Sequence, residues 1–108
     1  MRASYAREKI NSAAHALASG TGTIQKRLWD AYMEFHPLQS SDFPDDLKED
    51  WNEIHAALTT EEPTYNEKNE PIVGRVENTL RKMSDEAASE LAAKITGLQY
   101  SILTYGEK

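Results

Sequence analysis

Apolar residues recur at helical spacing along most of the chain, and this periodicity constrains the fold more than any other feature. The clearest stripe lies near the C-terminus, with 3-4-3-4-3 spacing: Ala88, Leu91, Ile95, Leu98, Ile102 and Tyr105. Such spacing places the apolar side chains on one narrow face of a helix. With Ser84 as N-cap and Gly106 as a stop, the pattern predicts a helix over 84–105. Gly97 lies inside it, where glycine costs about 1 kcal/mol relative to alanine unless another backbone approaches there.

The same periodicity predicts four further helices, over roughly 3–18, 23–36, 44–58 and 72–83. Pro44 suits a first helical turn, and Pro37 ends the helix before it. No segment alternates apolar and polar residues long enough to require a strand. We therefore expect an all-α fold, a compact bundle of four to five helices with no sheet, in a single domain over 1–108.

The segment 59–71 between the third and fourth helices is polar, acidic and interrupted by two prolines. These features predict a mobile loop that a partner could order. Gly74 weakens the start of the 72–83 helix, so that helix is either separate or a frayed extension of the loop.

Residues 19–26, SGTGTIQK, contain glycine and lysine but match no phosphate-binding motif. A Walker-type loop needs the lysine directly after its last glycine and a strand before the loop, whereas Lys26 comes four residues after Gly22 and follows a predicted helix. A weak anion site at the helix start remains an alternative, because free N–H groups there lie within a turn of Lys26 and Arg27.

The simpler interpretation of this stretch is a hinge between two antiparallel helices. Gly20 is expected to end the first helix in the left-handed conformation. Thr21 or Thr23 then caps the second helix, and Gly22 loosens the turn.

Motifs for catalysis or metal binding are missing from the sequence. There is no cysteine, and the three histidines, His15, His36 and His55, lack the spacing of a metal-binding helix. Neither a G-x-S-x-G elbow nor an EF-hand loop occurs. We therefore expect no catalytic, cofactor-binding or metal-ligating residues, and a protein that is not an enzyme.

The net charge of −6 is unevenly distributed. Residues 1–30 hold five basic and two acidic residues, whereas residues 31–70 hold two basic and eleven acidic ones. The acidic middle argues against general binding to a phosphate backbone. The alternative function is a nucleic-acid-associated regulator that uses the basic N-terminal third: Arg2, Arg7, Lys9, Lys26 and Arg27.

The lengths of the apolar segments bear on where the protein is located in the cell. No apolar run approaches the roughly 20 residues of a membrane span, and polar residues interrupt the first twenty where a signal peptide would need an apolar core. We expect no membrane association and a cytoplasmic protein.

Without catalytic motifs, the first functional hypothesis is a small helical module that binds another protein, as a regulator, inhibitor or adaptor of bacterial or phage type. The predicted contact residues are Lys26, Arg27 and Trp29 on the second helix and Glu49, Asp50 and Glu53 on the third. Exposed tryptophan is a common interface anchor. The 84–105 stripe is compatible both with a homodimer and with the central helix of a monomeric bundle.

Overall fold

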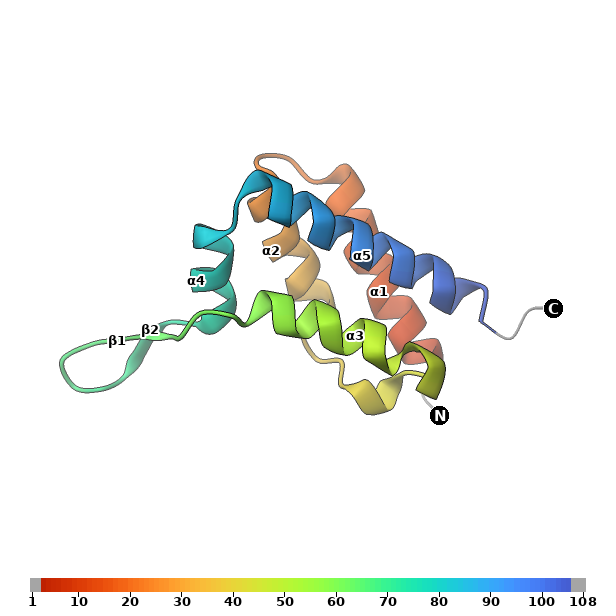
Figure 1. Cartoon of the computed structure of the whole chain (residues 1–108), viewed down its shortest axis with the longest axis horizontal. Coiled ribbons are helices and arrows are strands. Elements are labelled where there is room, and N and C mark those ends of the chain that lie inside the picture. Colours follow the sequence, from red (N-terminus) through yellow and green to blue (C-terminus); the bar gives the residue numbers. More distant parts are fainter. Residues whose placement is uncertain (1–2, 106–108) are drawn as a thin grey trace.

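The computed structural model describes residues 3–105 and is mostly helical (Figure 1). Its elements, in chain order, are α1 (Ala3–Ser19), α2 (Ile24–Phe35), the 3-10 turn η1 (Ser40–Asp42), α3 (Asp45–Leu58), β1 (Thr64–Tyr65), β2 (Pro71–Val73), α4 (Arg75–Lys82) and α5 (Asp85–Leu103). The helices predicted over 3–18, 23–36, 44–58 and 84–105 are present. The proposed stop at Gly106 lies outside the described residues.

The prediction of no sheet is wrong, because β1 and β2 pair as a small antiparallel hairpin within the segment predicted as a loop. Asn66 holds the turn: its side-chain oxygen accepts hydrogen bonds from the backbone N–H groups of Lys68 and Glu70, both at 2.9 Å. Asn69 has the left-handed φ of 62° that such a turn needs. Since β2 extends to Val73, the fourth helix begins at Arg75 and not at residue 72.

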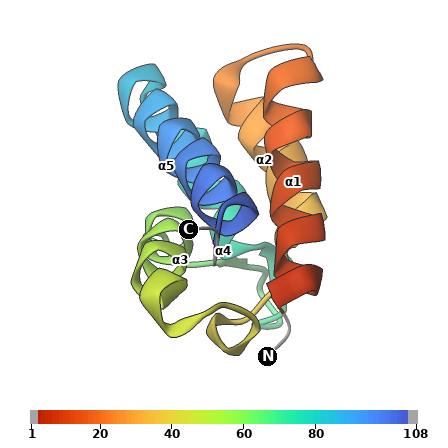
Figure 2. The ribbon, with the colours of Figure 1, turned by 90° about the vertical axis from the view of Figure 1, so that its right-hand side faces the viewer.

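The bundle packs α1 against α2 as an antiparallel pair, with α5 and α3 on the other side (Figure 2). Small residues on the inner face of α1, including Ala6 and Ala13, are fully buried and let the neighbouring helices come close. Phe35, Phe43 and Trp51 join α2, the η1 connection and α3, with Trp51 stacked 5.0 Å from Phe43 and edge-on 5.3 Å from Phe35. These three aromatics therefore belong to the buried core, whereas Trp29 is only partly buried against it.

The hinge between α1 and α2 differs from the prediction in one respect. The glycine in the left-handed conformation is Gly22, with φ of 89°, and not Gly20. Gly20 is needed for a different reason: a Cβ there would lie 2.6 Å from the carbonyl oxygen of Ala16. Thr23 caps α2 by accepting from the N–H of Lys26, and Ser84 caps α5 by accepting from the N–H of Ala87.

The predicted apolar stripe is buried from Ala88 to Ile102, whereas its last member, Tyr105, lies beyond the end of α5 and is 38% exposed. Ala88, Leu91, Ile95, Leu98 and Ile102 all belong to the core, and α5 packs on α1, α2 and α3. The stripe is thus the centre of one bundle, and the spacing that suggested a homodimer through 84–105 is already accounted for.

Candidate functional site

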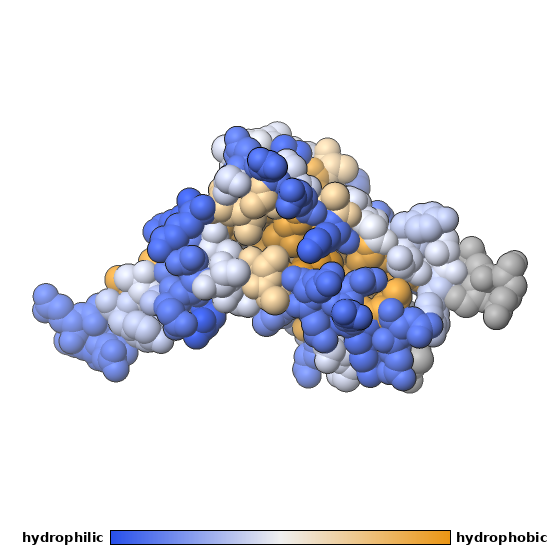
Figure 3. All heavy atoms as spheres, in the orientation of Figure 1, coloured by the Kyte–Doolittle hydropathy of each residue, from blue (hydrophilic) through white to orange (hydrophobic). Residues whose placement is uncertain are grey.

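Helices α3 and α5 lie side by side and antiparallel (Figures 1 and 2). Hollows lined by residues of both helices form a groove between them. Two hollows along it share Lys94 as a lining residue. On α5 the lining extends from Ala87 to Ser101, a helical rise of about 21 Å. In the space-filling view, apolar surface shows in the recess between the two helices (Figure 3).

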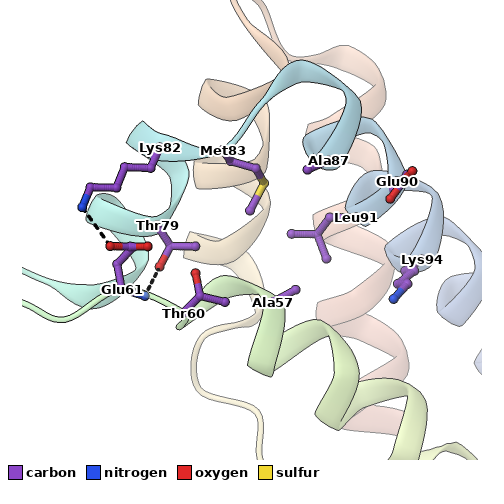
Figure 4. Close-up of a pocket in the computed structure, with 10 residues that line it drawn as sticks. All are labelled: Ala57, Thr60, Glu61, Thr79, Lys82, Met83, Ala87, Glu90, Leu91 and Lys94. Carbon is purple, nitrogen blue, oxygen red and sulfur yellow. Dashed lines mark hydrogen bonds and ion pairs between the residues drawn. The ribbon is translucent and has the colours of Figure 1, made fainter.

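The first hollow, of about 330 Å³, lies where the end of α3 faces α4 and the start of α5 (Figure 4). Met83 and Leu91 point into it, and Ala57 contributes from α3. The wall formed by α4 is fixed to the chain that leaves α3, because the Thr79 hydroxyl accepts from the N–H of Glu61 at 3.1 Å. Thr79 is itself buried, which holds this wall in place.

The second hollow, of about 250 Å³, continues the groove toward the N-terminal half of α3. Asp50 and Glu53 line it from α3, and Gly97, Leu98 and Ser101 line it from α5. A Cβ added to Gly97 would meet no heavy atom within 4 Å. Within the described chain, no neighbouring backbone comes close enough to require a glycine at this position of the helix. The space beside Gly97 in the groove is therefore open to another molecule.

The charges on the rim of the groove are mostly negative. Glu61 and Lys82 neutralise each other through an ion pair of 2.9 Å. The other charged lining residues are Asp50, Glu53, Glu90 and Lys94, and within residues 3–105 none of these four forms an ion pair. Asp50 and Glu53 on α3 therefore face Lys94 across the groove, and Glu90 lies one turn before Lys94 on α5.

The structure divides the predicted contact residues between different surfaces. Asp50 and Glu53 line the groove, whereas Glu49 is exposed on α3 but is not among the residues that line either hollow. Lys26 and Trp29 lie instead beside α4, in a shallow hollow of about 220 Å³.

Arg27 has a structural role that the sequence did not indicate. Its guanidinium donates to the carbonyl oxygen of Leu17, 3.2 Å away, near the end of α1. Lys26 pairs with Asp30 at 2.7 Å. Trp29 is half-buried and lies 5.7 Å from the ring of Tyr32. Lys26, Arg27 and Trp29 thus each make a contact within the chain, and their role in partner binding stays a prediction.

Two residues of the basic N-terminal third differ in their surroundings on α1. The Nε atom of Arg7 is buried, and Lys9 lies over the ring of Tyr5, 5.7 Å from its centroid. Arg2 lies outside the described residues.

A larger and more polar hollow, of about 700 Å³, lies where α1 meets α2 and α5. His15 and Glu34 line it. Gln99 and Asn11 line it as well, and the side-chain amide of Gln99 donates a hydrogen bond of 2.8 Å to the side-chain oxygen of Asn11. The titratable residues that line this hollow are thus one histidine and one carboxylate. Across residues 3–105, no three histidine or acidic side chains are grouped to hold a metal ion.

Sequence reasoning missed the α5 side of the groove. Glu90 and Lys94 stand one turn apart on that helix, and Met83 precedes its cap. The one signal that pointed there was Gly97, which is unfavourable in a helix interior.

The comparisons with known proteins identify no relatives from which a function could be transferred. Within the described residues, no helix has the length and apolar character needed to cross a membrane. No family model, curated protein or solved structure matches this chain.

Proposed function

We propose that this chain is a small interaction module that binds another protein through the groove between α3 and α5, and so acts as a regulator, inhibitor or adaptor. The observation that carries the proposal is the open groove itself, with its apolar floor and unpaired charged rim. Interfaces of this kind combine an apolar centre with a polar border. The open space at Gly97 supports the same assignment, because, apart from its chain neighbours and the adjacent helix backbone, no heavy atom of residues 3–105 lies within 4 Å of the position that a Cβ would take.

The test compares two substitutions of the same kind on one helix. Ala87 and Ala93 are both exposed on α5, but only Ala87 lines the groove. Ala87→Arg should obstruct the groove, whereas Ala93→Arg adds the same charge and bulk outside it. Circular dichroism of both variants controls for folding.

The measurement is affinity capture from a lysate of the source organism, with and without nuclease. We expect a stoichiometric protein partner that wild type and Ala93→Arg retain and that Ala87→Arg loses. If Ala87→Arg still captures the partner, the partner binds another surface, and this result would contradict the proposal that it binds in the groove. Nucleic acid that elutes with the protein, and whose removal also removes the partner, would favour the nucleic-acid alternative.

A further inference from the structure

We infer that the groove between α3 and α5 accepts a basic amphipathic helix of the partner protein. The inference rests on the proposed function and adds the chemistry of the occupant. Three features of the groove carry it: the backbone of its walls, its length, and the balance of charge on its rim.

The backbone of the walls favours a helical occupant. Both long walls are helices, and their main-chain groups are bonded within α3 and α5. A segment in extended conformation would find no free strand edge here, and its own N–H and C=O groups would lie unpaired against the apolar floor. A helix satisfies its main chain internally and presents only side chains. The groove's length of about 21 Å corresponds to about 14 helical residues.

The rim determines the charge of the occupant. Asp50 and Glu53 border one side and Glu90 the other, and Lys94 is the only cation among the unpaired lining residues of the described chain. Lysine or arginine on the flanks of the incoming helix would meet these carboxylates, and its apolar stripe would cover Met83 and Leu91. A single acidic residue on the occupant would complement Lys94.

The acidic rim also disfavours the hairpin of a second copy as the occupant. That arm exposes apolar side chains, with Tyr65 51% and Ile72 61% accessible. However, its turn carries Glu67 and Glu70 against Lys68, so it is acidic like the rim. Acidic groups brought together in an interface are repulsive.

The probe is a synthetic peptide of about 15 residues made of leucine and lysine, with leucine at i, i+3, i+4 and i+7 spacing. A second peptide carries glutamate in place of every lysine. Binding of each to the intact protein is measured by fluorescence anisotropy. We expect the leucine–lysine peptide to bind with an affinity that falls as salt rises, and the leucine–glutamate peptide not to bind.

A matched pair of variants on α3 separates groove binding from general attraction to an acidic protein. Glu53→Lys and Glu49→Lys change the net charge equally, and both residues are exposed without an ion pair in the described chain, but only Glu53 lines the groove. We expect Glu53→Lys to weaken binding of the leucine–lysine peptide about tenfold relative to Glu49→Lys. Lys94→Glu, which removes the unpaired lysine, should tighten binding.

Equal losses for Glu53→Lys and Glu49→Lys would overturn the inference, because they would show attraction to net charge alone. Failure of the leucine–lysine peptide to bind, or preference for the leucine–glutamate peptide, would also overturn it. Either result would leave the proposed function standing if capture of a protein partner still depended on Ala87. If capture of a partner did not depend on Ala87, the proposed function itself would be contradicted. The failure of the inference and the failure of the proposed function are therefore distinguishable.

Discussion

Gly97 is the residue whose presence its surroundings explain least. It occupies an interior position of α5, and a Cβ there would meet open space. We therefore expect Gly97→Ala to raise the free energy of unfolding by about 0.5–1 kcal/mol, because alanine restricts the unfolded chain and favours the helix. Urea denaturation followed by circular dichroism measures this change.

Gly20→Ala is the control for this prediction, and its expected sign is opposite. The new Cβ would lie 2.6 Å from the Ala16 carbonyl oxygen and 2.9 Å from Cγ of Arg27. The backbone oxygen cannot move away cheaply, so the variant should lose stability. A loss of stability in Gly97→Ala as well would contradict the open environment described for α5.

Asp45 provides a prediction about pH at the same scale. Lys48 lowers the pKa of Asp45 through a side-chain hydrogen bond, which is the larger effect, and through its positive charge. A lowered folded-state pKa means that the pair stabilises the protein above the ordinary pKa of 3.8 and loses this effect as pH falls through the folded value. In Lys48→Met, the pKa of Asp45 should rise toward its ordinary value. An NMR titration of the Asp45 carboxyl measures it, with Lys94→Met as a control that should leave it unchanged.

At the scale of single elements, the start of α5 depends on one hydroxyl. Ser84 accepts from the N–H of Ala87 at 3.1 Å, which satisfies one of the free donors of the first turn. Ser84→Ala should lower the free energy of unfolding by about 1 kcal/mol. Ser89→Ala removes an equivalent group from an exposed position within the same helix and should change stability by no more than about 0.5 kcal/mol. Thermal unfolding of the two variants provides the comparison, and equal losses would show that the cap contributes nothing specific.

The helices could be predicted from the sequence because apolar residues recur in them at helical spacing and because residues typical of helix ends flank them. The stripe from Ala88 to Ile102, the cap at Ser84 and the proline at 44 are local signals. The hairpin has no such period: its strands are two and three residues long, and Tyr65 and Ile72 are both exposed. Its signal was the pair of asparagines, Asn66 and Asn69, whose turn chemistry a search for alternating burial overlooks.

The charged residues on the α3 side of the groove could be predicted from the sequence. Asp50 and Glu53 could be chosen because they lie off the apolar stripe of their helix and carry concentrated charge. Lys94 lies about 40 residues away in the chain and lines the same hollow as Asp50 and Glu53 only because α3 and α5 pack against each other. Helical periodicity states which face of a helix is buried but not which helix covers it, so this pairing had no local signal.

At the scale of the whole molecule, the hairpin makes the shape elongated, with extents of 55 × 28 × 18 Å. The arm projects from the bundle beside α4 (Figure 1). Its base is tied to that helix by Asn78, which donates to the Glu62 carbonyl and the Thr64 hydroxyl, both at 2.9 Å, and by the ion pair of Arg75 with Glu62. None of the strand residues belongs to the hydrophobic core.

We therefore expect the bundle to fold without the arm. Thr64 and Val73 are paired across the hairpin, so replacing residues 65–72 by Asn-Gly closes the chain with a two-residue turn. The base contacts of Asn78 and Arg75 remain. Circular dichroism should show undiminished helix per molecule and one cooperative transition, with the melting temperature lowered by no more than about 5 °C.

The shortened protein also separates the arm from the groove. The lining of both hollows lies outside 65–72, so the leucine–lysine peptide should bind it with unchanged affinity. Weaker binding with an intact bundle would show that the arm reaches the occupant and belongs to the same surface. A broad or multistep transition would show instead that residues 65–72 belong to the cooperative unit and that the retained contacts at the base of the arm do not by themselves hold α4 against the end of α3, where the groove begins.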